Sequence, residues 1–194
     1  MDVGANSGQF ALMIHTILPE ASIYSFEPLE RCFRSLQQNA ENIKDMHCFR
    51  FALGDTNTRM VMHANEFSGS SSILEMAELH KTAFPYTRNS TEEQVEVRTL
   101  DSLLPQLRLQ SNVLAKLDVQ GYELNVLRGA EEALSHINVL VIETSFYQLY
   151  ENQPLFDDIY GYLNKRGFKY RGNFEQIMSA TNGEVLQADA IFTR

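Results

Sequence analysis

Asp2-Val3-Gly4-Ala5-Asn6-Ser7-Gly8 opens the chain, and an apolar run, Gln9–Leu18, follows it directly. A glycine-rich turn between a strand and a helix lets a ligand approach the backbone and meet the helix N-terminus. Gly4 and Gly8 permit that approach, and Asn6 tolerates left-handed dihedrals better than most residues. Because an ordinary tight turn also carries glycines, this stretch alone indicates a ligand only weakly.

A single acid strengthens this interpretation. Glu27 ends the predicted strand Ile23–Phe26, about twenty residues beyond the turn, where doubly wound folds place a carboxylate that accepts hydrogen bonds from ribose hydroxyls. The alternative is a surface glutamate at the start of the next helix, where the helix dipole favours an anion. Turn and acid together favour a nucleoside ligand, and both a nicotinamide cofactor and S-adenosylmethionine fit.

Strands and helices alternate along the chain. We expect strands at Met1–Gly4, Ile23–Phe26, His47–Leu53, Val113–Val119 and Ile137–Ile142, helices over Gln9–Leu18, Leu29–Ile43, Tyr122–Ser135 and Phe156–Leu163, and a closing hairpin of Phe168–Arg171 and Val185–Thr193. This order is typical of βαβ units around a parallel sheet. The apolar pattern of Gln9–Leu18 extends nearly all round, which predicts a deeply packed helix.

A long polar insertion, Asn65–Glu93, interrupts this pattern. Arg59–Ala64 and Gln94–Leu100 flank it with alternating apolar residues, so we expect them to pair as antiparallel strands. An insertion of this length inside a compact domain is usually functional or disordered. We expect it to act as a lid, with Ser70–Ser72 near the bound molecules.

A second cluster of polar residues follows the central strand. Lys116 and Asp118 share one face of that strand, Gly121 permits a close turn, and Glu123 lies in the next helical turn. Ligands in open α/β sheets bind beyond the carboxyl ends of strands. A buried Lys–Asp ion pair is the alternative reading. Glu143 ends the next strand, so it and Asp118 are expected to flank one crevice.

Two further acids have simpler interpretations. Leu53-Gly54-Asp55 ends the third predicted strand at the same edge of the sheet, where it would meet an adenine edge or form an ordinary turn. Asp101 is expected to be a helix N-cap.

Composition limits the possible partners. The 194 residues suit one domain, and the net charge of −9 with a pI near 5.0 argues against a broad nucleic-acid or anionic-membrane surface. The two cysteines are too few for a disulfide framework, and no metal-ligand spacing occurs. Without a leader or a membrane-length apolar run, a cytoplasmic location is the default expectation.

Seven motifs in order resemble one known family. They are DVGANSGQFA, SFEP, ALGD, SGSSSIL, VRTLDSL, KLDVQGYELNVLRGA and VLVIETSFYQLYE. Together they look like the FkbM family of S-adenosylmethionine-dependent methyltransferases, over Met1 to about Phe168. The resemblance implies a class I (Rossmann-like) fold: a seven-stranded, mostly parallel sheet of order 3-2-1-4-5-7-6, with helices on both faces and strand 7 antiparallel. It also favours S-adenosylmethionine over a nicotinamide cofactor.

The resemblance assigns site residues by their place in the motifs. The cofactor loop is matched by Asp2, Gly4, Ala5, Asn6 and Gly8, the ribose acid by Glu27, the segment near adenine by Leu53, Gly54 and Asp55, and the central signature by Lys116, Asp118, Gly121 and Glu123, with Glu143 following. Family members normally carry apolar residues before DVGAN, so we expect a truncated first strand and reduced stability.

The implied reaction is O-methylation of a hydroxyl on a sugar, a glycan or another small metabolite. We expect Asp118 to be the polar anchor near the methyl group, Glu143 to act as base or to bind the acceptor, and Lys116 to keep Asp118 ionised. Two alternatives remain: an RNA methyltransferase, which the acidic balance disfavours, and a non-catalytic Rossmann-like module that has lost cofactor binding.

Overall fold

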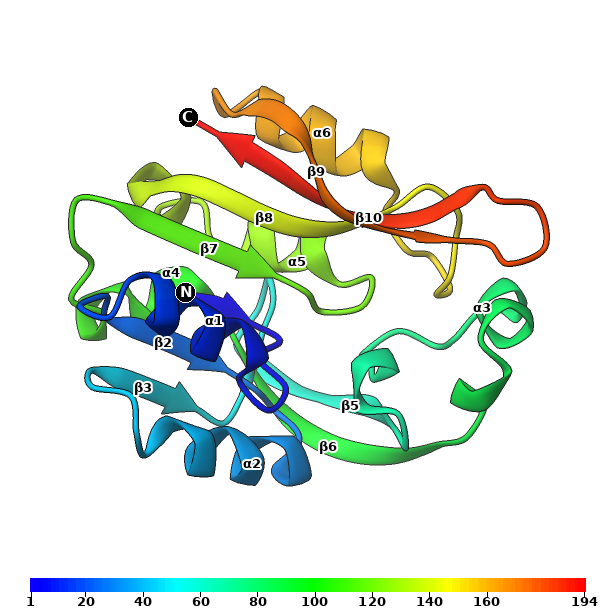
Figure 1. Ribbon diagram of the computed structural model, residues 1–194, viewed down its shortest axis with the longest axis horizontal. Helices are drawn as coiled ribbons and strands as arrows, with labels where there is room; N and C mark the ends of the chain where they lie inside the picture. The colour runs from blue at the N-terminus through cyan, green and yellow to red at the C-terminus, as the bar shows by residue number, and fades with distance from the viewer.

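A seven-stranded sheet forms the centre of the molecule (Figure 1). The computed structural model describes residues 1–194, and the strand order is β3-β2-β1-β7-β8-β10-β9. The strands are β1 (Asp2–Val3), β2 (Ile23–Phe26), β3 (Met46–Phe49), β7 (Val113–Leu117), β8 (Ile137–Ser145), β9 (Lys169–Met178) and β10 (Val185–Thr193). β10 is antiparallel to both of its neighbours, and β1, β2, β3, β7 and β8 are parallel. The predicted class I strand order is therefore confirmed.

Helices lie on both faces of this sheet (Figure 1). They are α1 (Gln9–Ile17), α2 (Glu30–Ala40), α4 (Leu100–Leu103), α5 (Glu123–Arg128) and α6 (Phe156–Asn164), with 3₁₀ turns at Leu104–Gln106 and Ala133–His136. Ala11 of α1 packs with Ile23 of β2. The opposite side chain of β2, Phe26, belongs to the main core together with Leu127 of α5 and Leu163 of α6.

That main core explains why the central strands are so apolar. It contains 25 buried residues, among them Phe26, Leu140 and Ile142, which are all completely buried. Full burial of each such side chain contributes about 1.5–3 kcal/mol. β7 and β8 hold the middle of the sheet and carry the polar residues at their carboxyl ends, so this core fixes where those residues lie.

A second, three-stranded sheet carries the insertion. Its order is β4 (Ala52–Leu53), β6 (Ser90–Arg98) and β5 (Thr58–Asn65), and β5 and β6 pair in antiparallel fashion, as predicted. Between β5 and β6 lie the 3₁₀ turn η1 (Ser68–Ser70), the helix α3 (Glu78–Ala83) and the 3₁₀ turn η2 (Pro85–Thr87). Figure 1 shows this segment reaching toward the side of the molecule where the turn between β9 and β10 lies.

The predicted single strand His47–Leu53 is wrong. The chain leaves the first sheet after Phe49, and Ala52 and Leu53 pair with Val97 and Arg98 of β6 in the second sheet. The apolar alternation runs through both strands, so it does not reveal that the pairing partner changes.

The predicted helix Tyr122–Ser135 is also shorter than expected. α5 ends at Arg128, and Gly129 follows as its C-cap. A β-carbon on Gly129 would stand 1.9 Å from the carbonyl oxygen of Gly54, so only glycine fits where the chain leaves the helix. Asp101 is not the cap of its own helix, where Thr99 accepts from the amide of Ser102 at 3.3 Å.

Asp101 instead caps the 3₁₀ turn that follows α5. Its carboxylate accepts from the backbone amide of Ala133 at 2.8 Å and from that of Glu132 at 3.1 Å. The predicted deep burial of α1 is likewise wrong, since Ala11 is its only buried residue and Ile17 is 65% exposed. None of the helices has the length and apolarity needed to cross a bilayer.

Candidate active site

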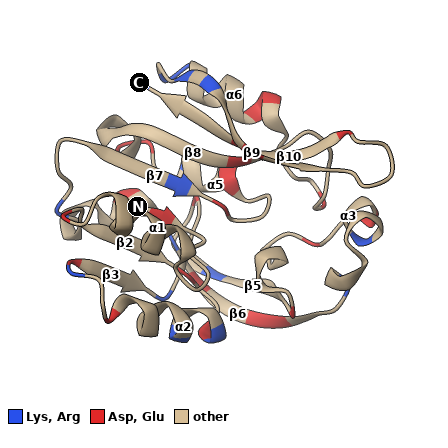
Figure 2. Ribbon diagram, in the orientation of Figure 1, with Lys and Arg blue, Asp and Glu red and all other residues tan.

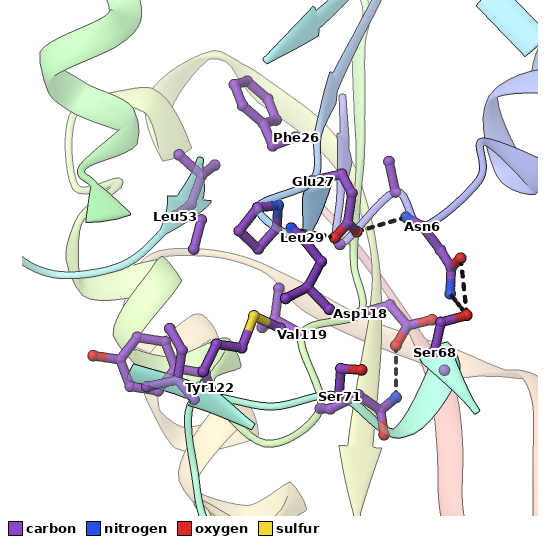
Figure 3. Close-up of a pocket in the computed structure, with 18 of the residues that line it drawn as sticks. Asn6, Phe26, Glu27, Leu29, Leu53, Ser68, Ser71, Asp118, Val119 and Tyr122 are labelled. Atoms are coloured by element: carbon purple, nitrogen blue, oxygen red, sulfur yellow. Dashed lines mark hydrogen bonds between the residues drawn. The ribbon is translucent and has the colours of Figure 1, made fainter. Parts of the chain in front are cut away.

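A cavity of about 240 Å³ lies at the carboxyl edge of the central strands. Its walls come from the loop after β1, the end of β2, the strand β4, the loop after β7 and the insertion (Figure 3). Of the residues predicted to bind cofactor, Gly4, Ala5, Asn6, Glu27 and Leu53 line it, whereas Asp2, Gly8, Gly54 and Asp55 do not. The fold thus brings these residues together from three separate motifs.

The loop after β1 owes its shape to its special backbone angles. Gly4, Asn6 and Gly8 have positive φ of 80°, 51° and 89°. A β-carbon on Gly4 would stand 1.9 Å from the carbonyl oxygen of Asp118, and one on Gly8 would stand 2.8 Å from Leu36. These glycines are therefore required for packing against the neighbouring strand and helix, while the open side of the loop faces the cavity.

Glu27 joins this loop to the end of β2. Its carboxylate accepts from the backbone amides of Asn6 and Leu29, both at 2.9 Å. Only 5% of Glu27 is exposed, and burial raises its pKa to about 7. Because each carboxylate oxygen can accept a second hydrogen bond, Glu27 retains acceptor capacity toward the cavity.

The opposite end of the cavity is apolar. Leu53, Met62, Ile73, Val119 and Tyr122 line it. In Figure 3, Leu53 and Tyr122 lie on the side away from Asn6 and Ser68. A pocket with one polar and one apolar end suits a nucleoside, with a ribose near Glu27 and a base among the apolar side chains.

Gly54 and Asp55 support this apolar end from behind. The amide of Gly54 donates to the carbonyl of Arg98 at 3.0 Å, and Asp55 accepts from Asn125 Nδ2 at 3.0 Å. The structure therefore gives both residues contacts that tie β4 to β6 and α5.

The insertion closes one side of the cavity. Asn6 Nδ2 donates to Ser68 Oγ at 3.0 Å, and Ser72 Oγ donates to the carbonyl of Gln120 at 2.6 Å. Ser71 and Ile73 also line the cavity, and Ser70 and Ser72 are buried. The serine-rich stretch thus spans from the cofactor loop to the loop after β7.

Four polar side chains meet at the carboxyl end of β7. Lys116 Nζ lies 2.5 Å from Asp118 Oδ2, which confirms an ion pair on the shared face of the strand. Gln120 Nε2 donates to Asp118 Oδ1 at 2.9 Å and to Glu143 Oε2 at 2.8 Å. Asp118 and Glu143 therefore flank one crevice, as the sequence predicts, and Gln120 joins them.

Burial and neighbouring charge act on this cluster. Burial, followed by the negative charge of Asp118, raises the pKa of Glu143 well above its ordinary value of 4.5. For Lys116 the attraction of Asp118 outweighs the lowering effect of burial, and its pKa is raised from 10.5. The ammonium therefore stays charged beside Asp118.

Glu123 plays a different part from the other signature residues. It is 4% exposed, and its Oε1 accepts from the amides of Val119 and Gly121 at 3.0 and 3.1 Å. Glu123 thereby shapes the loop that presents Asp118 and Gln120, without lining the cavity.

Gln120 was not among the site residues predicted from the sequence. Its φ of 54° is left-handed, and this turn directs its side chain toward Asp118 and Glu143. A glutamine before a glycine carries no motif of its own, so only the loop geometry reveals its place.

The comparison with protein families decides the classification. The sequence model described as the methyltransferase FkbM domain matches residues 2–170. The chain belongs to this family. The FkbM match confirms the resemblance seen in the motifs and identifies a methyltransferase domain, the class whose methyl donor is S-adenosylmethionine.

Curated proteins similar to this FkbM domain include methyltransferases. A 2-O-methyltransferase, NoeI, from Sinorhizobium fredii is 29% identical over 159 residues, which cover 79% of this chain and 65% of the relative. A hexuronic acid methyltransferase, AglP, from Haloferax volcanii is 27% identical over 145 residues, covering 73% of this chain and 54% of the relative. The FkbM domain thus spans less than two thirds of either relative.

A solved structure agrees on the fold of the FkbM domain. Aeropyrum pernix fibrillarin in complex with S-adenosyl-L-methionine superposes with a TM-score of 0.51 at 11% identity, covering 97% of this chain and 64% of that chain. Identity this low supports the fold alone.

Proposed function

We propose that the protein transfers a methyl group from S-adenosylmethionine to a hydroxyl of a sugar, a glycan or another small metabolite. The observation that carries this proposal is that Asp118 lines both the nucleoside-shaped cavity and a second groove along the sheet edge. The carboxylate at the junction of two compartments is the group that meets both donor and acceptor. The names of NoeI and AglP support a sugar-like acceptor.

The proposed cofactor contacts follow from the cavity. Glu27 would accept from the ribose hydroxyls, the loop Gly4–Asn6 would face the ligand, and Leu53 and Tyr122 would enclose the adenine. Gly8, Gly54 and Asp55 support the lining residues from behind, and Asp2 lies in β1. The cofactor supplies an activated methyl group, so the protein's main task is alignment of the acceptor.

Asp118 is the proposed general base. An alcohol must lose its proton as its oxygen takes the methyl group, and a carboxylate within hydrogen-bond reach takes that proton. Lys116 holds one oxygen of Asp118 in the 2.5 Å ion pair, and Gln120 fixes the second oxygen. Glu143 holds the acceptor hydroxyl beside it.

Paired conservative variants test these roles. We expect Asp118→Asn to lower kcat by about 10²–10⁴-fold, the usual contribution of a positioned acid or base. Glu143→Gln is expected to raise KM for the acceptor more than it lowers kcat. S-adenosylhomocysteine affinity, measured by calorimetry, serves as the control for folding. Normal turnover in both variants would refute the assignment.

The same measurements separate the alternative functions. A chain that binds no S-adenosylhomocysteine at high micromolar concentration would be a non-catalytic module. A salt-dependent shift of RNA in a gel would indicate an RNA methyltransferase. The acidic net charge of −9 favours neither RNA binding nor a phosphorylated partner.

A further inference from the structure

A groove of about 350 Å³ continues from the cofactor cavity along the edge of the sheet. The two compartments share Gln9, Lys116 and Asp118. β8 and β10 form the floor of the groove, and the start of α1 and the β9–β10 hairpin form its walls. Because it shares Asp118 with the cofactor cavity, this groove is the proposed acceptor site.

The groove is lined by carboxylates without matching cations. Asp118, Glu143, Glu175 and Asp189 line it, and Lys116 is its only basic residue. Lys116 is already paired with Asp118 at 2.5 Å. Asp189 lies opposite Glu143 in the strand register. Figure 2 shows acidic segments on the strands beside the single basic segment at the end of β7.

A buried amide in the groove lacks a partner. Gln187 is 3% exposed, lines the groove, and its Nε2 has no hydrogen-bond partner. An unsatisfied buried donor costs about 1–3 kcal/mol. An acceptor oxygen of a bound molecule placed against this amide would remove that cost.

Apolar surface complements these polar groups. Phe10 and Met13 of α1 line the groove opposite Phe174 and Ile177 of β9, which are 60% and 42% exposed. Such surfaces pack against the C–H faces of a sugar ring, while ring hydroxyls donate to carboxylates.

We infer that the groove selects an uncharged sugar ring and rejects the corresponding uronate, and that Gln187 donates to an oxygen of that sugar. This inference rests on the proposed function. Ring hydroxyls satisfy Glu143 and Asp189, whereas a sugar carboxylate brings a further negative charge beside Asp189 and Glu175 with no free cation to receive it. The groove would thus differ in preference from the hexuronic acid methyltransferase to which the chain is similar.

Matched sugars test the selection. The probes are p-nitrophenyl β-glucoside and β-glucuronide, with the corresponding galactoside and galacturonide, and labelled S-adenosylmethionine as donor. We expect kcat/KM for the neutral sugar to exceed that for its uronate by at least about tenfold, since like charges this close repel by that order. Asp189→Asn is expected to narrow this ratio by about threefold or more, because it removes one of the repelling charges.

Gln187→Leu tests the amide. We expect about a five- to tenfold rise in KM for the neutral sugar, the effect of one lost hydrogen bond, with little change in kcat and in S-adenosylhomocysteine affinity. Gln38→Leu, on the exposed side of α2, is the control and is expected to change none of these values.

The outcomes distinguish the inference from the function on which it rests. A higher kcat/KM for the uronate would overturn the inferred selection, and so would a neutral-to-uronate ratio of kcat/KM that is unchanged in Asp189→Asn. Neither result would contradict the proposed methyltransferase activity. Cofactor binding without transfer to any of the four sugars would overturn the sugar acceptor. Failure to bind S-adenosylhomocysteine would overturn the proposed function as well.

Discussion

Glu27 shows how a single residue links the architecture to ligand binding. The carboxylate is held by two backbone amides, yet burial raises its pKa to about 7. In the free protein it is therefore protonated below that pH. Ribose hydroxyls donate best to the ionised form, so ligand binding favours loss of this proton.

The predicted result is a pH-dependent affinity. S-adenosylhomocysteine is expected to bind more tightly as pH rises from 6 to 8, by up to about tenfold per unit below the pKa. Affinity is lost as pH falls through 7, because the bound state favours the carboxylate. Calorimetry across this range measures the effect, and Glu27→Gln is expected to bind weakly with a flat profile. A wild-type affinity that falls with rising pH would contradict the role.

At the scale of elements, two glycines at helices have different reasons to be glycine. Gly129 is required for close packing between elements, whereas Gly161 only lowers the helix propensity of its segment. A β-carbon on Gly129, at the end of α5, would stand 1.9 Å from the Gly54 carbonyl, whereas one on Gly161, inside α6, meets no atom within 4 Å. We expect Gly129→Ala to lower the free energy of unfolding by at least about 2 kcal/mol. Gly161→Ala is expected to raise it by about 0.5–1 kcal/mol. Urea denaturation measures both, and a neutral Gly129→Ala would show that β4 and α5 can move apart.

Elements were predictable where the pattern is local. The apolar runs of β7 and β8 and the closing hairpin are visible in the sequence, and the motifs supply the strand order. The division of His47–Leu53 between two sheets was not predictable, because pairing with β6 decides it. Gln187 was missed for a similar reason: only cross-strand register places it opposite Ser145 and beside the groove.

At the scale of the whole molecule, the insertion joins the two sheets across the site. Tyr150, after β8, has its hydroxyl 3.2 Å from the carbonyl of Ser70 and 2.9 Å from Gln120 Oε1. Met76 forms an isolated bridge with Tyr150. If the insertion moves when a ligand binds, either these contacts of Tyr150 break or Tyr150 and Gln120 move together with the insertion.

Tyr150→Phe tests this connection. The variant loses the hydroxyl but keeps the ring, so we expect a loss of about 1 kcal/mol in stability. Residues 65–93 are expected to become more sensitive to protease, and S-adenosylhomocysteine with acceptor to reduce that sensitivity in the wild type. Tyr86→Phe, with a 64% exposed ring, is the control. Protease sensitivity that is the same with and without ligands would argue against a lid.

The close approach of Gly4 to the Asp118 carbonyl can couple the binding of the cofactor to the binding of the acceptor. No side chain separates the two loops there, so a shift of one backbone is passed directly to the other. If cofactor binding moves Asp118 and thereby strengthens acceptor binding by some factor, the acceptor strengthens cofactor binding by the same factor. The same reciprocity holds after methyl transfer. If S-adenosylhomocysteine changes the affinity for the methylated product by some factor, the methylated product changes the affinity for S-adenosylhomocysteine by that same factor.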